Sequence, residues 1–171
     1  DDATLPTPEP ALGRVLRFGA LAPGALFARR YRIAGRLGAG GAGEVYRARD
    51  ELAGTDVALK VLFPRGDDAG HPLARLRREV RITRGLSHPG ILRVHDIGDE
   101  DGLLYLVMEL LAGETLRERL QRRGALPPAE AASIAAAVLD ALAVAHAHRA
   151  VHRDVKPSNV FLAPEGDAER V

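Results

Sequence analysis

The sequence contains no cysteine, no tryptophan and one methionine, and only 4% of its residues are aromatic. Without cysteine there are no disulfide bonds and no thiolate metal sites. The longest apolar run, Ile134 to Leu139, is far shorter than the roughly 20 residues with which a helix crosses a bilayer. No signal sequence with a charged start and an apolar centre opens the chain. We therefore expect a cytoplasmic protein that makes no membrane contact through this segment, and leave open an anchor outside it.

An excess of charge of either sign is also absent, because 24 lysines and arginines face 23 aspartates and glutamates. The net charge of +1 offers no electrostatic reason to bind nucleic acid or an anionic membrane, so we expect neither as a partner. Lysine itself is scarce, since Lys60 and Lys156 are the only two and every other such cation is arginine. Either both lysines persist by chance, or both positions require a compact ammonium instead of a planar guanidinium.

Residues 1–25 carry four of the 11 prolines together with many alanines and glycines, and they show no sustained periodicity. This composition predicts a flexible lead-in. The ordered chain is then expected to begin near Phe27 or Tyr31. The hydrophobic content of 46% in 171 residues is enough for the core of one domain or of two small lobes.

A Gly-x-Gly-x-x-Gly pattern is formed by Gly38, Gly40 and Gly43. It stands between two predicted strands, residues 31–37 and 44–49. Glycine lets the backbone approach a ligand closely and turn its N–H groups toward phosphate oxygens. A dinucleotide-binding fold would need a helix after the glycines, and a Walker A loop would need lysine and serine or threonine there. A strand that begins Glu44-Val45 disfavours both, which leaves a phosphate-binding hairpin or a plain glycine-rich turn.

A third predicted strand, residues 55–63, holds Lys60 among apolar neighbours, where a cation is costly unless it is paired. A helix is predicted over residues 73–86, because apolar residues recur there three to four apart. Glu79 is the only acid in this helix and is therefore the natural partner of Lys60, the alternative being a lysine that points to solvent. The arginines of the same helix are interpreted as a solvated face and not as a nucleic-acid site.

Two further strands are predicted at residues 91–97 and 103–109, which completes an antiparallel sheet of five strands with one helix packed on it. Thr115 to Glu118 forms a capping box, the signature of a helix start, and Gly124 ends this short helix. A longer helix follows over about residues 127–149, and we expect part of its apolar face to stay exposed. The histidines near its end point in different directions, which argues against a metal site.

A polar cluster between two short apolar runs, residues 151–159, is typical of a loop that a rigid frame holds in place. Asp154 could accept a proton, and Lys156 could neutralise an anion. Asn159 offers an amide oxygen, a ligand suited to a hard cation such as Mg²⁺. The spacing matches the catalytic loop His-Arg-Asp-x-x-x-x-Asn of protein kinases.

Five features stand in one order along the chain: the glycine hairpin, the Val-Ala-Leu-Lys segment that ends at Lys60, Glu79, the stretch Met108 to Gly113, and the polar loop. In this order and spacing the sequence, from near Phe27 onward, resembles bacterial serine/threonine protein kinases of the eukaryotic-like type. The resemblance implies an α+β, protein-kinase-like two-lobe fold. Its N-lobe, about residues 26–111, would hold the five-stranded antiparallel sheet and one helix. About residues 112–171 would form the first part of a helical C-lobe.

By this resemblance the protein uses ATP and Mg²⁺ to phosphorylate serine and threonine hydroxyls of protein substrates, and Lys156 two residues after Asp154 favours these acceptors over tyrosine. Asp154 would orient the substrate hydroxyl and accept its proton, while Lys156 would steady the γ-phosphate. Lys60, held by Glu79, would bind the α- and β-phosphates, and Asn159 would bind one Mg²⁺. The remaining ATP contacts would come from Leu37, Gly38, Gly40, Gly43, Val45, Ala58, Met108, Glu109, Leu111 and Phe161.

Arg153 would have a regulatory role, pairing with a phosphate on the activation loop. No Asp-Phe-Gly follows Asn159 within the 171 residues, and with it the second Mg²⁺ ligand is missing. We therefore expect truncation, no phosphoryl transfer by these residues alone, and activity only in the full-length protein, where self-association and autophosphorylation stay open. Two alternatives remain: a pseudokinase-type module that binds nucleotide or partners, and a small-molecule phosphotransferase, which fits Lys156 and the glycines less well.

Overall fold

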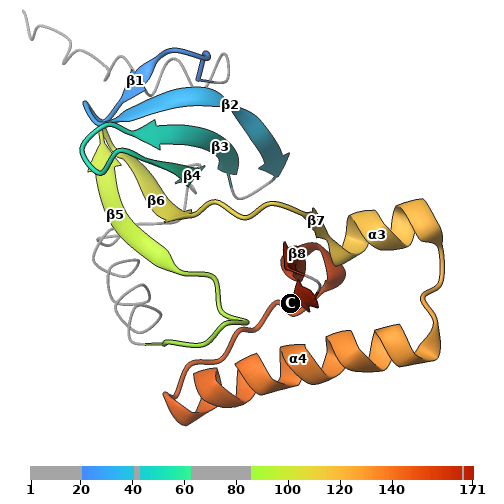
Figure 1. The fold of residues 1–171 in the computed structure, drawn as a ribbon. Helices are drawn as coiled ribbons and strands as arrows, with labels where there is room; N and C mark the ends of the chain where they lie inside the picture. The colour runs from blue at the N-terminus through green and yellow to red at the C-terminus, as the bar shows by residue number, and fades with distance from the viewer. Residues whose placement is uncertain (1–20, 41–42, 63–85, 167) are drawn as a thin grey trace, which may run out of the picture. The chain divides into compact units, whose positions relative to one another are not determined.

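A computed structural model describes residues 21–40, 43–62, 86–166 and 168–171 of the chain (Figure 1). The chain divides into two compact units, which are described separately below. The first contains the described residues between 21 and 62 together with 94–110, and the second contains 86–93 and 111–171. The predicted helix over residues 73–86 lies, apart from its last residue, outside the described residues, and so does Glu79.

The first unit is an antiparallel sheet whose six strands follow the order β1-β2-β3-β4-β6-β5 (Figure 1). The strands are β1 (Leu26–Phe27), β2 (Tyr31–Gly40), β3 (Gly43–Asp50), β4 (Thr55–Leu62), β5 (Val94–Glu100) and β6 (Leu103–Glu109). The five longer strands confirm the five that the sequence predicts, and the two-residue β1 adds one at the edge. β5 begins at Val94 and not at residue 91, because the N–H of Ile91 closes a turn onto the carbonyl of His88.

One face of this sheet forms the core of the unit. Side chains alternate between the two faces along a strand, and Tyr46 of β3 and Leu59 of β4 are fully buried on the core face. Phe27 and Tyr31 pack edge-on against Tyr105, with ring centroids 5.2 and 5.8 Å away. Each aromatic pair of this kind adds about 1 kcal/mol beyond the burial of its area, so β1, β2 and β6 are joined at one point.

The packed chain begins before the first strand. Leu21 is buried in the core, and its N–H donates to the hydroxyl of Tyr46 at 3.1 Å. The N–H of Gly24 donates to the carbonyl of Ile33 at 2.8 Å. The composition predicts a flexible lead-in up to residue 25, whereas residues 21–25 are attached to β2 and β3. Local composition does not reveal this, because the contact of Leu21 spans 25 positions in the sequence.

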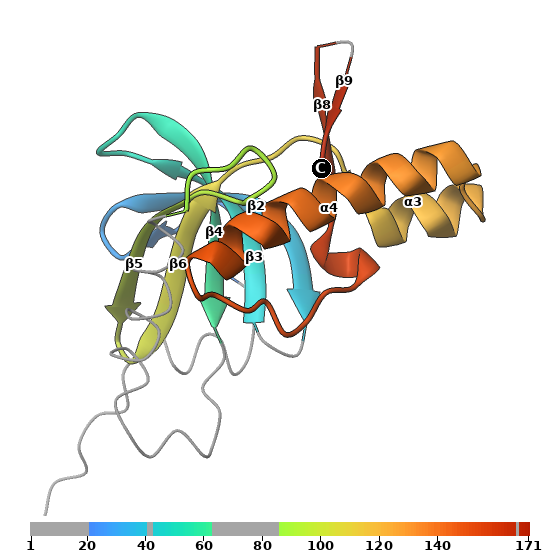
Figure 2. The same cartoon turned by 90° about the horizontal axis from the view of Figure 1, so that it is seen from below.

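The described residues of the second unit form two helices, a 3-10 turn and a small sheet of order β7-β8-β9 (Figure 2). Its elements are β7 (Glu114–Thr115), α3 (Leu116–Arg123), α4 (Pro128–Ala147), η1 (Pro157–Asn159), β8 (Phe161–Glu165) and β9 (Ala168–Arg170). The helices α3 and α4 run in opposite directions (Figure 1). Residues 86–93 are tied to α4, because the ring of His88 lies 3.1 Å from the carboxylate of Asp140.

The start of α3 confirms the predicted capping box. The side chain of Thr115 accepts a hydrogen bond from the N–H of Glu118 at 3.2 Å, and the Glu118 carboxylate accepts one from the N–H of Thr115 at 2.7 Å. Gly124 ends the helix in a positive-φ conformation, with its N–H on the carbonyl of Leu120. All these signals are local, and the helix bounds were accordingly predicted to within a residue.

The longer helix α4 is mostly apolar, and half of its residues are alanine. Ile134 is the one buried residue of this fully described helix; Val138 and Leu142 of the predicted buried face are half-buried, and Leu139 is 65% exposed. With 20 residues and a mean hydropathy of 1.5, α4 could cross a membrane by length and composition alone, a weak criterion that the core helix of a soluble domain also meets. Much of its apolar face is thus left uncovered by the described residues.

The carboxylate of Asp50, at the end of β3, accepts two hydrogen bonds from the guanidinium of Arg30. Arg30 donates from Nε and Nη2 to Asp50 at 2.9 and 2.7 Å, and the N–H groups of Leu52 and Ala53 donate to the same carboxylate. The Asp50 side chain is only 4% exposed. The hydrogen bonds from Arg30 lower the pKa of Asp50 to about 2, against the burial that would raise it. The pair therefore stabilises the first unit only while Asp50 is ionised.

The first prediction concerns this pair. The pKa of Asp50 lies below its ordinary value of 3.8, so its contribution to stability is complete above about pH 4 and is lost as the pH falls toward about 2. Asp50→Asn should lower the free energy of unfolding at neutral pH by about 2–4 kcal/mol and remove that acid-dependent loss. Urea denaturation at several pH values, followed by circular dichroism, measures both effects. Asp56→Asn, which removes a half-exposed partner of Arg47 and Arg49, is the matched control, and equal effects of the two substitutions would contradict the assignment.

A single arginine joins three elements of the second unit. The guanidinium of Arg119 on α3 lies 3.0 Å from Glu114 of β7, 2.6 Å from Glu169 of β9 and 3.5 Å from Glu130 of α4. Its side chain is 13% exposed. This mostly buried cation therefore holds together three carboxylates that would otherwise repel each other.

We therefore predict that Arg119→Leu lowers the free energy of unfolding of the second unit by about 2–4 kcal/mol, because three carboxylates lose their shared cation. Hydrogen exchange of the backbone amides in β7, β8 and β9 should accelerate with it. Arg122→Leu is the control, since Arg122 also pairs with Glu114 but its side chain is 61% exposed. The assignment is wrong if both substitutions accelerate exchange equally.

Candidate active site

In the first unit, four of the predicted nucleotide-binding residues lie on the sheet face opposite the core. Val45 of β3 is paired with Lys60 of β4, and Ala58 of β4 with Met108 of β6. Each of them neighbours a core-facing residue along its strand, so the alternation of side chains places all four on the second face. A row of three apolar side chains and one cation is thereby assembled from three strands.

The three glycines of the β2–β3 hairpin differ in what the fold demands of them. Gly43 has a φ of +146°, and a Cβ added there would lie 2.1 Å from the carbonyl oxygen of Val61. β3 and β4 can therefore approach each other only with glycine at this position. A Cβ added at Gly38 or Gly40 would meet no described atom within 4 Å, so packing among the described residues does not require glycine there. The side chain of Leu37, just before them, is 55% exposed.

An acid next to the glycines is an additional feature that the sequence motifs did not predict. Glu44 is only 9% exposed, accepts a hydrogen bond from the hydroxyl of Tyr46, and pairs with Arg36 at 3.1 Å. Burial, and then the hydrogen bond to Glu44, raises the pKa of Tyr46 to about 12. Because Arg36 precedes the glycines and Glu44 follows them, the pair links the two strands of the hairpin next to its glycine-rich turn. The sequence contains one signal for it, because Glu44 has the same two-residue spacing as the core residues Tyr46 and Ala48 of β3.

Lys60 is half-buried and forms no ion pair within the part of the chain that the structure describes. Its predicted partner, Glu79, lies outside that part, so the pairing stays a prediction. Glu109, the last residue of β6, is half-buried opposite Val57. Leu111, the next predicted contact of the adenine, already belongs to the second unit.

In the second unit, three predicted catalytic residues meet in the loop before β8. The ammonium of Lys156 lies 2.7 Å from the carboxylate of Asp154, and the amide nitrogen of Asn159 donates to the same carboxylate at 3.0 Å and to the Asp154 carbonyl at 2.8 Å. The hydrogen bond from Lys156, and then that from Asn159, lowers the pKa of Asp154. Asp154 is 60% exposed, so an ionised carboxylate faces solvent from a loop that fixes its position.

The loop around Asp154 is held by backbone contacts on both sides. The N–H of Asp154 donates to the ring nitrogen of His152 at 3.3 Å, and the N–H of Asn159 donates to the carbonyl of Lys156 at 2.8 Å, which closes η1. Arg153 between them has a positive φ of 63°, an uncommon conformation for a residue with a side chain. The Arg153 side chain is exposed and forms no ion pair within the described ranges.

The strand after the loop anchors it to α3. Phe161 of β8 is paired with Thr115 of β7, and the N–H of Leu116 donates to the carbonyl of Val160 at 2.9 Å. Gly113 allows this approach, since a Cβ there would lie 2.1 Å from the carbonyl oxygen of Leu162. The first turn of α3 and the end of the catalytic loop are consequently held side by side.

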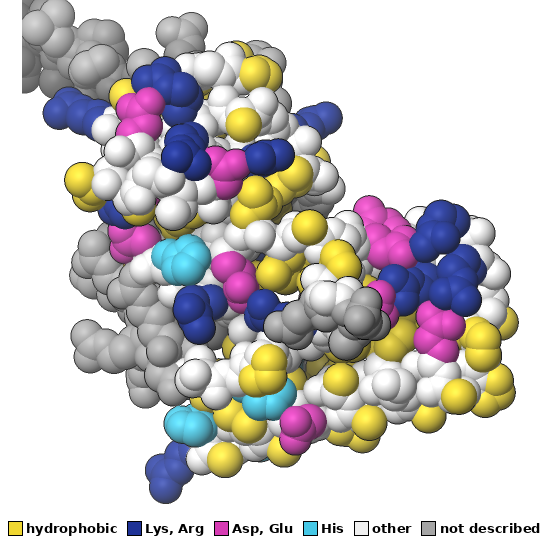
Figure 3. All heavy atoms as spheres, in the orientation of Figure 1, with side chains coloured by type: hydrophobic (Ala, Val, Ile, Leu, Met, Phe, Trp, Pro, Cys, Tyr) yellow, Lys and Arg dark blue, Asp and Glu magenta, His cyan; other side chains and the backbone are white. Residues whose placement is uncertain are grey.

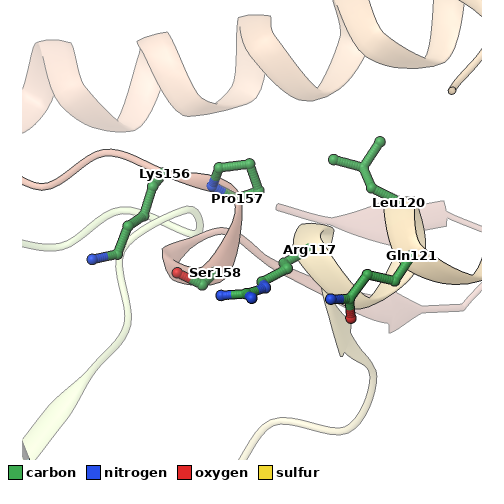
Figure 4. A pocket seen from close by; sticks show the side chains of 6 residues that line it. All are labelled: Arg117, Leu120, Gln121, Lys156, Pro157 and Ser158. Atoms are coloured by element: carbon green, nitrogen blue, oxygen red, sulfur yellow. The ribbon is translucent and has the colours of Figure 1, made fainter. Parts of the chain in front are cut away.

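A groove of about 520 Å³ opens where these two segments meet (Figure 4). It is lined by Arg117, Leu120, Gln121, Lys156, Pro157 and Ser158. The sequence motifs assign a role only to Lys156 among them. The other lining residues carry no sequence signal, because what they share is a position on two segments that are far apart in the chain.

The predicted site residues therefore form two sets. Asp154, Lys156 and Asn159 are in direct contact in the second unit, which also holds Leu111, Arg153 and Phe161. The glycines, Val45, Ala58, Lys60, Met108 and Glu109 belong to the sheet of the first unit. Within the described ranges, no three His, Cys, Asp or Glu side chains converge in the manner of a metal centre.

Comparison with known proteins places the chain in a family. PrkC of Bacillus subtilis, a serine/threonine-protein kinase, is 39% identical over 139 residues, which are 81% of this chain and 21% of PrkC. The serine/threonine-protein kinase PknA of Mycobacterium tuberculosis is 40% identical over 151 residues, which are 85% of this chain and 35% of PknA.

Among solved structures, the kinase domain of PknI from Mycobacterium tuberculosis superimposes with a TM-score of 0.76 at 38% identity, covering 88% of this chain and 60% of the chain in that structure. The chain thus spans less than two thirds of the length of these relatives. The family model described as the protein kinase domain matches residues 31–169, from the first residue of β2 to the middle of β9. The chain belongs to the protein kinase domain family.

Proposed function

We propose that this chain forms the nucleotide-binding and catalytic-loop part of a kinase that transfers the γ-phosphoryl group of ATP to serine and threonine hydroxyls of proteins. PrkC and PknA are both named serine/threonine-protein kinases. The observation that carries the proposal is the contact of Asp154 with Lys156 and Asn159. Because ATP is the phosphoryl donor, the proposed location of the active protein is the cytoplasm.

Asp154 acts on the acceptor. Its exposed carboxylate can accept a hydrogen bond from a serine or threonine hydroxyl and aim the oxygen at the γ-phosphorus. The oxygen–phosphorus bond forms, the bond from the γ-phosphorus to the bridging oxygen of ADP breaks, and the hydroxyl proton passes to Asp154. A lowered pKa makes this carboxylate a weak base, so its main contribution is orientation, with proton transfer late in the reaction.

Lys156 and Asn159 supply the charges around that acceptor. The ammonium of Lys156, 2.7 Å from Asp154, can move from the carboxylate to the negative charge of the incoming phosphoryl group. The amide nitrogen of Asn159 faces two acceptors of Asp154, which leaves its amide oxygen as the available ligand. That oxygen fits a hard cation, and Mg²⁺ bound there would neutralise phosphate charge.

The second sheet face of the first unit suits the nucleotide. A flat base is proposed to lie against Met108 and Ala58, whose side chain is small, and the other proposed contacts of the base are Leu37, Val45, Leu111 and Phe161. Lys60 follows on the same face, about 7 Å further along the strand, where the phosphates of a base-bound nucleotide would begin. Glu79 is proposed to hold Lys60, and the backbone of Glu109 and Leu111 to bind the base edge.

The proposed roles of Gly38, Gly40 and Arg153 rest on their exposure to solvent. Gly38 and Gly40 have open space where a side chain would lie, which the phosphates of ATP would use. Arg153 is exposed and is proposed to bind a regulatory phosphate. No observation favours the pseudokinase alternative, because Lys60, Asp154 and Asn159 are all present.

Substitution of Asp154 tests the catalytic assignment. In the full-length gene product, Asp154→Asn should lower kcat by about 10²–10⁴-fold and leave ATP binding nearly unchanged, because Asn keeps the shape but cannot accept the proton. Transfer of labelled phosphate to a protein substrate measures kcat, and calorimetry measures ATP binding. The exposed Asp101→Asn in the β5–β6 turn is the matched control. Full activity of Asp154→Asn would refute the assignment.

The scarcity of lysine offers a second test. If Lys60 needs a compact ammonium, Lys60→Arg should lower kcat/KM for ATP by about ten- to hundredfold, since a guanidinium is larger and planar. The reverse change at an exposed site, Arg49→Lys, should have no effect on the same constant. Steady-state kinetics with varied ATP separate the two. An unchanged kcat/KM in Lys60→Arg would mean that lysine persists there by chance.

A further inference from the structure

The groove between α3 and η1 carries positive charge and no acid. Of its six lining residues, Arg117 and Lys156 are cationic and none is anionic. Figure 4 shows the guanidinium end of Arg117 beside Ser158. Lys156 is engaged with Asp154 at 2.7 Å, so the charge that remains available in the groove is that of Arg117.

Arg117 differs from the other arginines of α3. Figure 3 shows basic and acidic side chains gathered over this helix. Arg119, Arg122 and Arg123 each form an ion pair with a glutamate, at 2.6, 2.5 and 2.9 Å respectively. Arg117 forms none within the part of the chain that the structure describes, and its side chain is exposed.

The acids near Arg117 are already engaged. Glu118, its neighbour in sequence, is held in the capping box by the N–H and the hydroxyl of Thr115. Glu114 binds Arg119 and Arg122, and those hydrogen bonds lower its pKa. The nearby acids thus already have partners within the fold, and the guanidinium of Arg117 is left available to bind an anion of another molecule.

The other groove residues complement an anionic side chain. Ser158 is half-buried, and its hydroxyl makes no hydrogen bond to another described residue. Leu120 and Pro157 offer apolar walls for methylene groups, and Gln121 offers an amide. A guanidinium with a hydroxyl beside it is a donor set that carboxylate and phosphate oxygens match well.

The groove also adjoins the catalytic loop. Ser158 precedes Asn159, whose amide contacts Asp154. A polypeptide whose hydroxyl is bound at Asp154 would therefore have neighbouring side chains within reach of the groove. Resting on the proposed protein kinase function, we propose that Arg117 selects protein substrates that carry an anionic side chain, a carboxylate or a phosphorylated residue, near the acceptor.

The test uses the full-length gene product and a series of acceptor peptides. One glutamate, one phosphoserine or one alanine is moved through each position that flanks the acceptor. The wild type should prefer an anionic residue over alanine at one position by about three- to tenfold in kcat/KM, the scale of an exposed charged contact. The preference should reside in the KM for peptide. The glutamate and phosphoserine arms distinguish the two sources of negative charge.

Substitutions then assign the preference to one side chain. Arg117→Gln should abolish it, Arg117→Lys should keep part of it, and Arg117→Glu should invert it toward a lysine-containing peptide. Arg123→Gln is the matched control on the same helix, and it should leave the preference intact. The KM for ATP should not change in any of these variants.

The outcomes separate this inference from the proposed function. If the wild type phosphorylates peptides with no preference for an anion, or if Arg117→Gln and Arg123→Gln reduce the preference equally, the inference fails and the kinase function stands. A change confined to the KM for ATP would also overturn it. If the wild type phosphorylates no serine or threonine at all, the proposed function fails and the inference fails with it.

Discussion

The alternation of side chains along β3, β4 and β6 is the constraint on which the nucleotide half of the site depends. A sheet that buries one face against its own core can offer only the other face to a ligand. Tyr46, Leu59 and Val107 lie on the core face. Because side chains alternate along a strand, Ala58 and Lys60 must lie on the second face. A shift of register by one residue would exchange the two faces completely, so the core packing and the proposed ATP site are specified by the same strand pairing.

The second unit depends on a distribution of charge instead. Its acids are placed beside arginines that join β7, α3, α4 and β9, while Asp154 is held by Lys156 and Asn159. Because nearly every acid near α3 has a partner in the fold, Arg117 stands out as the one arginine of α3 that forms no ion pair with a described residue. The ion pairs that join β7, α3, α4 and β9 therefore also leave Arg117 as the charge that is proposed to bind a substrate.

Elements with local signals could be predicted from the sequence. The longer strands followed from alternation, and α3 followed from Thr115, Glu118 and Gly124, whose contacts span three or four positions. The catalytic loop was recognisable because its functional residues Asp154, Lys156 and Asn159 lie close together in the sequence. β1 was missed because two residues show no period, and the burial of Leu21 was missed because it rests on a distant hydroxyl. The role of Arg119 depends on an acid 50 positions away, which no local pattern contains.

The glycine hairpin has a consequence for how its motif is understood. Gly43 is required while the chain folds, since β3 could not otherwise lie against Val61. Gly38 and Gly40 meet no such demand from the described residues, so their small size matters only when something occupies the open space above them. The three glycines of one motif thus meet two separate requirements, strand packing at Gly43 and space for a ligand at Gly38 and Gly40. Loss of the third glycine would look like a folding defect, and loss of either of the others like a binding defect in a protein that still folds.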